Sequence, residues 1–139
     1  LGCPLELAFQ FPCNVLDRRF ENIRMPKGKR YARSVFLQGL LASENGLRTD
    51  APSELLKMKN EYHELLKEHN INPISFAVSY ITHNDCVDYY LVGVESNSQL
   101  LGLLNFESDI FQDITFLDPL LTNTSKEWFD PRKWNKTVK

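Results

Sequence analysis

Three stretches of the chain carry apolar residues in patterns that predict β-strands. In residues 5–11 the large apolar side chains occupy every second position, so one face of that strand is apolar and the other is small or polar. Residues 31–37 form the second expected strand. The third, residues 87–92, is almost entirely apolar, as in a strand covered on both faces. Pro12 and Gly93 end the first and the third of these runs.

Apolar residues at steps of three and four predict helices between and after these strands. The first helix, from about residue 53, has an apolar stripe that leaves out His63, which we expect to lie in solvent. Its stripe consists of Leu55, Met58, Tyr62, Leu65, Leu66 and His69. Asn72 and Pro73 start a second helix, which we expect to run to about residue 82. A third helix runs from about residue 97 to about residue 106, and Ser96 before it fits the capping box S-x-x-Q together with Gln99.

The order of these elements is strand, strand, helix, helix, strand, helix. Strands that alternate with helices imply parallel pairing and right-handed crossovers, so the predicted fold class is α/β. Residues 87–99 then form a strand, a glycine turn and a capped helix. Such a corner favours anions, because free backbone N–H groups and the helix dipole both attract negative charge. The alternative is a βα turn with a good cap and no ligand.

The composition is that of an ordinary globular domain. The 139 residues are 42% hydrophobic and 24% charged with a net charge of −2, which argues against a general nucleic-acid binder. No apolar run approaches the roughly 20 residues of a membrane span, and no secretory leader is visible, so we expect a cytoplasmic protein. Cys3, Cys13 and Cys86 fit no zinc spacing, so we expect reduced thiols and no metal site. The chain opens without an initiator Met, and we expect it to be part of a longer protein.

Several motifs resemble a known family. QFPxNxLDRRF in residues 10–20, RSVFLQGLL in residues 33–41, the helix pair 53–81 and VDYYLVGVESNSQL in residues 87–100 resemble the C-terminal part of the aldo/keto reductases. In that family these segments are the sixth, seventh and eighth strands of a (β/α)8 TIM barrel with the segments that follow them. The resemblance implies a partial barrel over residues 1–121, with about three parallel strands and flanking helices. An aromatic tail covers residues 122–139, and its EWFDPRKWN resembles the ending of a bacterial branch of the family.

The resemblance also implies a dinucleotide site, for NADP or NAD, at the carboxyl ends of the strands. Gln10 matches the residue that hydrogen-bonds the nicotinamide carboxamide. Arg33 stands where many members stack an aromatic ring on the nicotinamide, and a guanidinium can stack on a ring too. The loop under the pyrophosphate corresponds to Ser34, Val35, Phe36, Leu37 and Gly39. The segment that holds the adenosine 2′-phosphate corresponds to Gly93, Val94, Glu95, Ser96 and Gln99.

Three departures from the family bear on the predicted chemistry. Glu95 and Gln99 stand where NADP-specific members place lysine and arginine, and a carboxylate beside a phosphate is unfavourable. The family's catalytic aspartate, tyrosine, lysine and histidine come from its first four strands, which this chain lacks, so we predict no catalytic residue here. Residues 21–29 are too few, and contain Pro and Gly, for the helix that the family places after its sixth strand.

We therefore expect the cofactor-side portion of an NAD(P)-dependent oxidoreductase that reduces carbonyl groups and is inactive alone. The alternative is a non-catalytic interaction or self-assembly module derived from the same fold. A third hypothesis is a nucleotide-sugar binder that uses the basic residues 18–30. Because three parallel strands leave two open edges, we expect a partner: the missing N-terminal barrel portion, or a second copy in a homo-oligomer.

Overall fold

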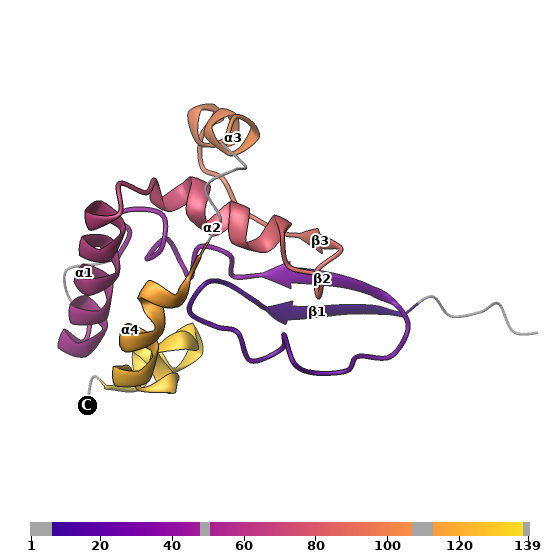
Figure 1. Cartoon of the computed structure of the whole chain (residues 1–139), viewed down its shortest axis with the longest axis horizontal. Coiled ribbons are helices and arrows are strands. Elements are labelled where there is room, and N and C mark those ends of the chain that lie inside the picture. The colour runs from indigo at the N-terminus through magenta and orange to yellow at the C-terminus, as the bar shows by residue number, and fades with distance from the viewer. Residues whose placement is uncertain (1–6, 48–50, 107–112, 138–139) are drawn as a thin grey trace, which may run out of the picture.

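Three short parallel strands form one sheet in the computed structural model, which describes residues 7–47, 51–106 and 113–137 (Figure 1). They are β1 (Ala8–Pro12), β2 (Lys29–Arg33) and β3 (Tyr89–Tyr90), in the order β1-β2-β3. β2 pairs in parallel with both neighbours. The α/β fold with about three parallel strands is therefore confirmed.

β2 and β3 are shorter than the apolar patterns predict, and residues 5 and 6 of the first predicted strand lie outside the described residues. β2 ends at Arg33 because Ser34 has a φ of 60°, which takes the backbone out of the extended conformation. Residues 34–37, which we predicted as the end of this strand, form turns instead. Val35 and Leu37 are nevertheless buried. The apolar pattern thus identified buried side chains correctly, but the prediction of extended backbone at residues 34–37 was wrong.

Two consecutive helices build the core together with the sheet. α1 (Ser53–Glu68) buries the predicted stripe positions Leu55, Met58, Tyr62 and Leu66. α2 (Pro73–Thr82) begins where the sequence predicts, because the Ser75 N–H donates to Oδ1 of Asn72 at 3.0 Å. One buried cluster joins residues of both helices to Phe11 and Ala32 of the sheet.

His63 is buried on α1, although the sequence predicted a side chain in solvent. Its exposed fraction is 3%, and its Nε2–H donates to the carbonyl oxygen of Leu40 at 2.8 Å. The loop after β2 lies against this side of the helix, where Lys59 and Lys67 of α1 also bind Glu44. The prediction was wrong because a loop, which carries no helical periodicity, covers this face of α1.

Two glycines allow that loop to fold back on itself. Gly39 has a φ of 86°, in the left-handed region that favours glycine. A Cβ atom on Gly46 would lie 1.9 Å from the carbonyl oxygen of Gly39, so the two backbones touch where a side chain would stand. The Gly46 N–H donates to the carbonyl oxygen of Ser43 at 2.9 Å, which closes a turn over residues 43–46.

α3 (Asn97–Leu104) lies beyond α2, on the far side from the sheet (Figure 1). It ends two residues before the predicted boundary. Leu103 is its buried side chain, whereas Leu100, Leu101 and Leu104 are exposed, Leu104 by 70%. α3 therefore presents an apolar face that no other described part of the chain covers.

The C-terminal segment begins with two short helices that pack against α1. It comprises η2 (Thr115–Leu117), α4 (Asp118–Asn123), η3 (Lys126–Phe129) and η4 (Pro131–Thr137). Trp128 and Phe129 are buried in the core, and the Trp134 indole N–H donates to the carbonyl oxygen of Trp128 at 3.0 Å. The aromatic side chains of the tail thus lie over an apolar surface. The division of the chain at residues 121 and 122 stays a prediction.

The second face of the sheet is open to solvent. Since side chains alternate along a strand, Gln10, Tyr31 and Tyr89 share this face, lying side by side in the register of the sheet. Tyr89 is 48% exposed and Leu91 is 46% exposed. In a closed barrel the corresponding face is the interior. We call the four residues Gln10, Tyr31, Tyr89 and Leu91 the inner face.

Candidate functional site

The residues predicted to hold a dinucleotide lie in the strands or follow their carboxyl ends. Gln10 belongs to β1, Arg33 is the last residue of β2, and residues 34–39 follow β2 directly. Residues 93–99 lie between β3 and the first turn of α3. Barrels of parallel strands carry their active sites at the edge where the carboxyl ends meet. The chain has three segments that start from this edge.

Two hydrogen bonds join the segments that follow β1 and β2. The Cys13 N–H donates to the carbonyl oxygen of Arg33, and Nδ2 of Asn14 donates to the carbonyl oxygen of Ser34, both at 3.0 Å. The Asn14 side chain is fully buried, and its Oδ1 accepts from the N–H groups of Leu16 at 3.0 Å and Asp17 at 2.9 Å. The end of β1 is therefore tied directly to the end of β2.

Asn14 is a residue that our sequence reasoning missed. The motif QFPxNxLDRRF contains it, but we assigned it no role. The sequence feature that could have identified Asn14 is a single amide side chain between Cys13 and Val15, immediately after a predicted strand that ends at Pro12. A buried amide in such a position needs hydrogen-bond partners from another segment.

Gln10 and Arg33 lie on the open side of this edge. The Gln10 side chain is exposed on the inner face. Arg33 is half-buried, and its Nη1 donates to Oγ of Ser34 at 3.3 Å. Beside Gln10, the rings of Tyr31 and Tyr89 stack with centroids 5.0 Å apart and an interplanar angle of 20°. The sequence did not single out these two tyrosines.

The loop after β2 is conformationally restrained. Ser34, Leu37, Gln38 and Gly39 all have positive φ, which side chains other than glycine adopt at a cost. Val35 and Leu37 point into the core, so only their backbone groups can face a ligand. Left-handed residues turn successive N–H groups toward one side, an arrangement that suits anions.

The segment 93–99 is exposed along its whole length and forms the predicted cap. The Gln99 N–H donates to Oγ of Ser96 at 3.2 Å, and Oε1 of Gln99 accepts from the N–H of Glu95 at 2.7 Å. Within the described residues, the N–H groups of Asn97 and Ser98 make no hydrogen bond. The helix start can therefore offer two backbone donors to an anion, but no side chain of the segment carries positive charge.

These groups fit part of a dinucleotide. The Gln10 amide suits a carboxamide, and the free N–H groups of α3 suit a phosphate. An adenosine 2′-phosphate fits less well because the exposed Glu95 carboxylate would repel it. No hydrogen bond or ion pair of the described residues joins 93–99 to Gln10 or to residues 33–39. The assignment of these residues to a cofactor stays a prediction.

Three of the six basic residues in 18–30 make ion pairs within the described part of the chain. Arg19 donates to both carboxylate oxygens of Asp17 at 2.7 Å, and Arg30 donates to both oxygens of Asp88 at 3.1 and 2.8 Å. Burial lowers the pKa of the Arg18 guanidinium. Arg24, Lys27 and Lys29 are exposed and make no ion pair with other described residues, so the hypothesis of a nucleotide-sugar site stays a prediction.

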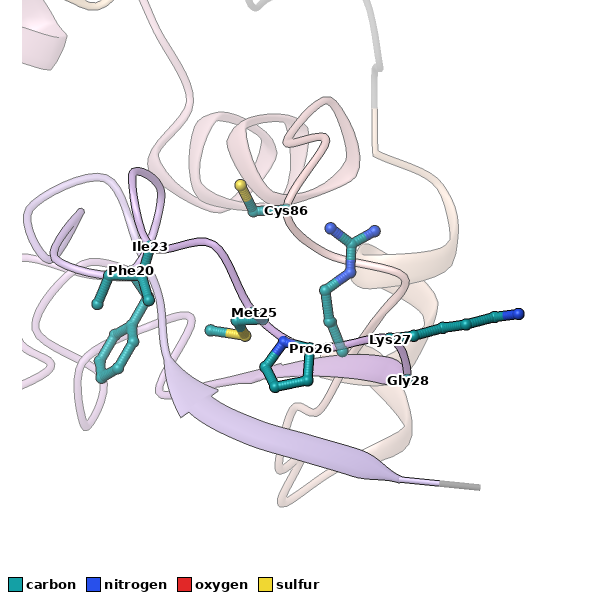
Figure 2. Close-up of a pocket in the computed structure, with 8 residues that line it drawn as sticks. Phe20, Ile23, Met25, Pro26, Lys27, Gly28 and Cys86 are labelled. Atoms are coloured by element: carbon teal, nitrogen blue, oxygen red, sulfur yellow. The ribbon is translucent and has the colours of Figure 1, made fainter. Parts of the chain in front are cut away.

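A pocket of about 260 Å³ lies at the opposite end of β2 (Figure 2). Its walls are Phe20, Ile23, Met25, Pro26, Lys27, Gly28, Arg30 and Cys86. Residues 21–29, for which the family resemblance implies a helix, run here without one and form much of this wall. Figure 2 shows the Lys27 side chain pointing away from the pocket. The pocket does not coincide with the predicted dinucleotide site, because it lies at the amino end of β2.

No metal-ligating cluster occurs among residues 7–47, 51–106 and 113–137. No helix in these ranges is long and apolar enough to cross a membrane.

Comparison with known proteins supports the fold. No family model and no curated protein sequence matches the chain. Among solved structures, the chain is similar to the glycerol dehydrogenase AKR11B4 from Gluconobacter oxydans, with a TM-score of 0.57 and 17% sequence identity. The match covers 81% of this chain and 40% of that enzyme, so the chain spans less than half of the structure it resembles. At this identity the likeness concerns the fold. The chain therefore has the fold of part of an aldo/keto reductase, with three parallel strands and flanking helices of its TIM barrel.

Proposed function

We propose that the chain is the C-terminal, cofactor-side portion of an aldo/keto reductase-like oxidoreductase that uses NADP or NAD to reduce carbonyl groups. The observation that carries this proposal is the parallel order β1-β2-β3 in a fold shared with part of such an enzyme. Because of this order, the three segments predicted to bind the dinucleotide all lie at the edge of the sheet where the strands have their carboxyl ends.

In this proposal the residues of the chain bind and orient, and do not transfer protons. When bound, the nicotinamide supplies the hydride. Gln10 would hold the carboxamide, and the Arg33 guanidinium, restrained by Ser34, would lie beside the ring. The Asn97 and Ser98 N–H groups would receive a phosphate at the start of α3. The proton donor of the family comes from strands outside this chain, so the isolated chain is inactive.

The choice between the two cofactors follows from charge. Residues 93–99 contain Glu95 and no lysine or arginine. A 2′-phosphate placed here would meet a carboxylate without a compensating cation. We therefore expect NADH to bind at least as tightly as NADPH.

We also propose that the chain works with a partner in the cytoplasm. The inner face and the outer edges of β1 and β3 have no neighbour within the described residues. The partner is either the N-terminal portion of the barrel or a second copy in a homo-oligomer. Neither nucleic acid nor a membrane is part of the proposal.

A second candidate is a non-catalytic interaction or self-assembly module. The exposed leucines of α3 and the open inner face favour it, because both would suit protein contact without any nucleotide. The absence of the family's catalytic strands from the chain is compatible with it.

Isothermal titration calorimetry of the pure chain with NADH and with NADPH separates the two candidates. We expect saturable binding that Gln10→Ala weakens roughly threefold to tenfold, as for one lost hydrogen bond. Ser96→Ala, which removes the cap of α3, is expected to weaken binding as well. Asn60→Ala, which deletes an exposed amide on α1, serves as the control.

Failure of the wild-type chain to bind either dinucleotide would overturn the proposal and favour the interaction module. In the same preparation we expect no oxidation of NADPH with simple aldehydes. Measurable turnover by pure protein would contradict the statement that the chain is inactive alone.

A further inference from the structure

We propose that Asn14 is a positioning residue for the nicotinamide end of the site, acting through Ser34 on Arg33. The inference rests on the proposed function, because it concerns how that site is held. Asn14 itself is fully buried and touches no ligand.

The first step is the bond between two segments far apart in sequence. Nδ2 of Asn14 donates to the carbonyl oxygen of Ser34 across 20 residues. The neighbouring Cys13 N–H donates to the carbonyl oxygen of Arg33. The two peptide groups at the carboxyl end of β2 are thus both held from the segment after β1.

The second step is the conformation of Ser34. Its φ of 60° is unfavourable for a residue with a side chain, so the surrounding structure must support it. The Asn14 bond acts on the carbonyl of this residue. At this point the chain leaves the strand and turns into the loop that runs beneath the predicted pyrophosphate position.

The third step links Ser34 to the predicted nicotinamide contact. Oγ of Ser34 accepts from Nη1 of Arg33 at 3.3 Å. A long guanidinium side chain keeps one orientation only when its end is held. Asn14 therefore fixes Ser34, and Ser34 restrains the arginine that would lie beside the ring.

Asn14 also shapes its own turn, because its Oδ1 accepts from the Leu16 and Asp17 N–H groups. A useful substitution must separate this local role from the link to Ser34. Asn14→Asp keeps the acceptor oxygen Oδ1 and replaces the Nδ2 donor with a second oxygen that faces the Ser34 carbonyl. Asn14→Ser, the second variant, keeps a local acceptor but is too short to reach Ser34.

The test compares NADH affinity in the wild type, Asn14→Asp, Arg33→Ala and the double variant, at a temperature where circular dichroism shows every variant folded. We expect Asn14→Asp alone to weaken binding about fivefold, as for one hydrogen bond. In the Arg33→Ala background it is expected to have no further effect, because the group it positions is gone. Leu66→Ala, a cavity in α1, is the control that lowers the melting temperature and leaves the affinity unchanged.

The outcomes are distinguishable. A wild-type chain that binds no dinucleotide overturns the proposed function and this inference together. A wild type that binds, with Asn14→Asp either equal to it or additive with Arg33→Ala, overturns the inference alone. Should Asn14→Asp fail to fold, Asn14→Ser replaces it in the same cycle with the same expected results.

Discussion

The Cys13 thiol is enclosed at the end of β1, where it is 1% exposed. Burial raises its pKa from an ordinary value of 9.0 to about 12, and the negative charges of Glu21 and Asp17 add to the effect. Burial also raises the pKa of the Tyr62 hydroxyl above its ordinary value of 10.0. Both groups are therefore held neutral in the folded chain.

A group with a raised folded-state pKa stabilises the protein below its unfolded-state pKa, and this contribution is lost as the pH rises. For Cys13 we expect the unfolding free energy to fall between pH 9 and about 12, by about 1.4 kcal/mol per pH unit for one proton. Urea unfolding of the wild type and Cys13→Ala from pH 7 to 11 measures it. In the variant, the free energy of unfolding is expected not to fall from pH 9 onward. It is still expected to fall at the higher pH where Tyr62 titrates in the unfolded chain. Parallel curves for the two proteins would contradict this account.

Single buried polar residues were hard to predict from the sequence. Asn14 and His63 both contact segments more than 19 residues away, and local periodicity contains no information about such partners. Ser96 and Asn72 were predicted correctly because their partners lie three residues ahead. The predictable polar contacts are thus those whose two ends lie within one helical turn.

At the scale of elements, the fold of the loop after β2 depends on a close backbone contact between its two glycines. It covers His63 of α1 and carries the predicted pyrophosphate residues at its start. The close approach of Gly46 to the Gly39 carbonyl makes the loop dependent on the absence of a Cβ atom.

Gly46→Ala is expected to destabilise the chain by about 1–3 kcal/mol, because the new methyl group must push the two backbones apart. Gly93→Ala is the matched control, since a Cβ there would meet nothing within 4 Å and the residue has no positive φ. Urea unfolding followed by circular dichroism measures both. An equal effect of the two substitutions would contradict the packing argument.

Helices and strands differed in how well their patterns predicted them. The start of α2 followed from Asn72 and Pro73, which mark the first turn of a helix by local chemistry. The end of β2 did not follow from the pattern, because apolar residues continue through residues 35–37 while Ser34 has already left the strand. The pattern reports which side chains are buried, and extended backbone is only one way to bury them.

At the scale of the whole molecule, the uncovered surfaces dominate. The sheet buries one face against the helices and leaves the inner face in water, while α3 exposes its leucines. The motifs QFPxNxLDRRF and RSVFLQGLL predicted the partial barrel. The position of α3 beyond α2 was not predictable, because the leucines of a helix carry no information about which partner covers them.

We expect the isolated chain to associate in solution through the inner face. Leu91→Glu is expected to weaken association at least about tenfold, because it would bury an unpaired carboxylate in the contact. Ile23→Glu changes a side chain of similar exposure in the pocket of Figure 2 and is the control. Sedimentation equilibrium over a range of concentrations measures both. A stable wild-type monomer with a cooperative melt would overturn the expectation.

The bonds that tie Cys13 and Asn14 to the end of β2 have an evolutionary consequence. These hydrogen bonds join the carboxyl ends of β1 and β2. They do not involve residues 21–29, which run without a helix to the opposite end of β2. A barrel built in this way can lose or gain a helix on one side while the side that faces a ligand keeps its shape. Length changes between β1 and β2 are therefore expected to be neutral for binding, and relatives that differ there need not differ in chemistry.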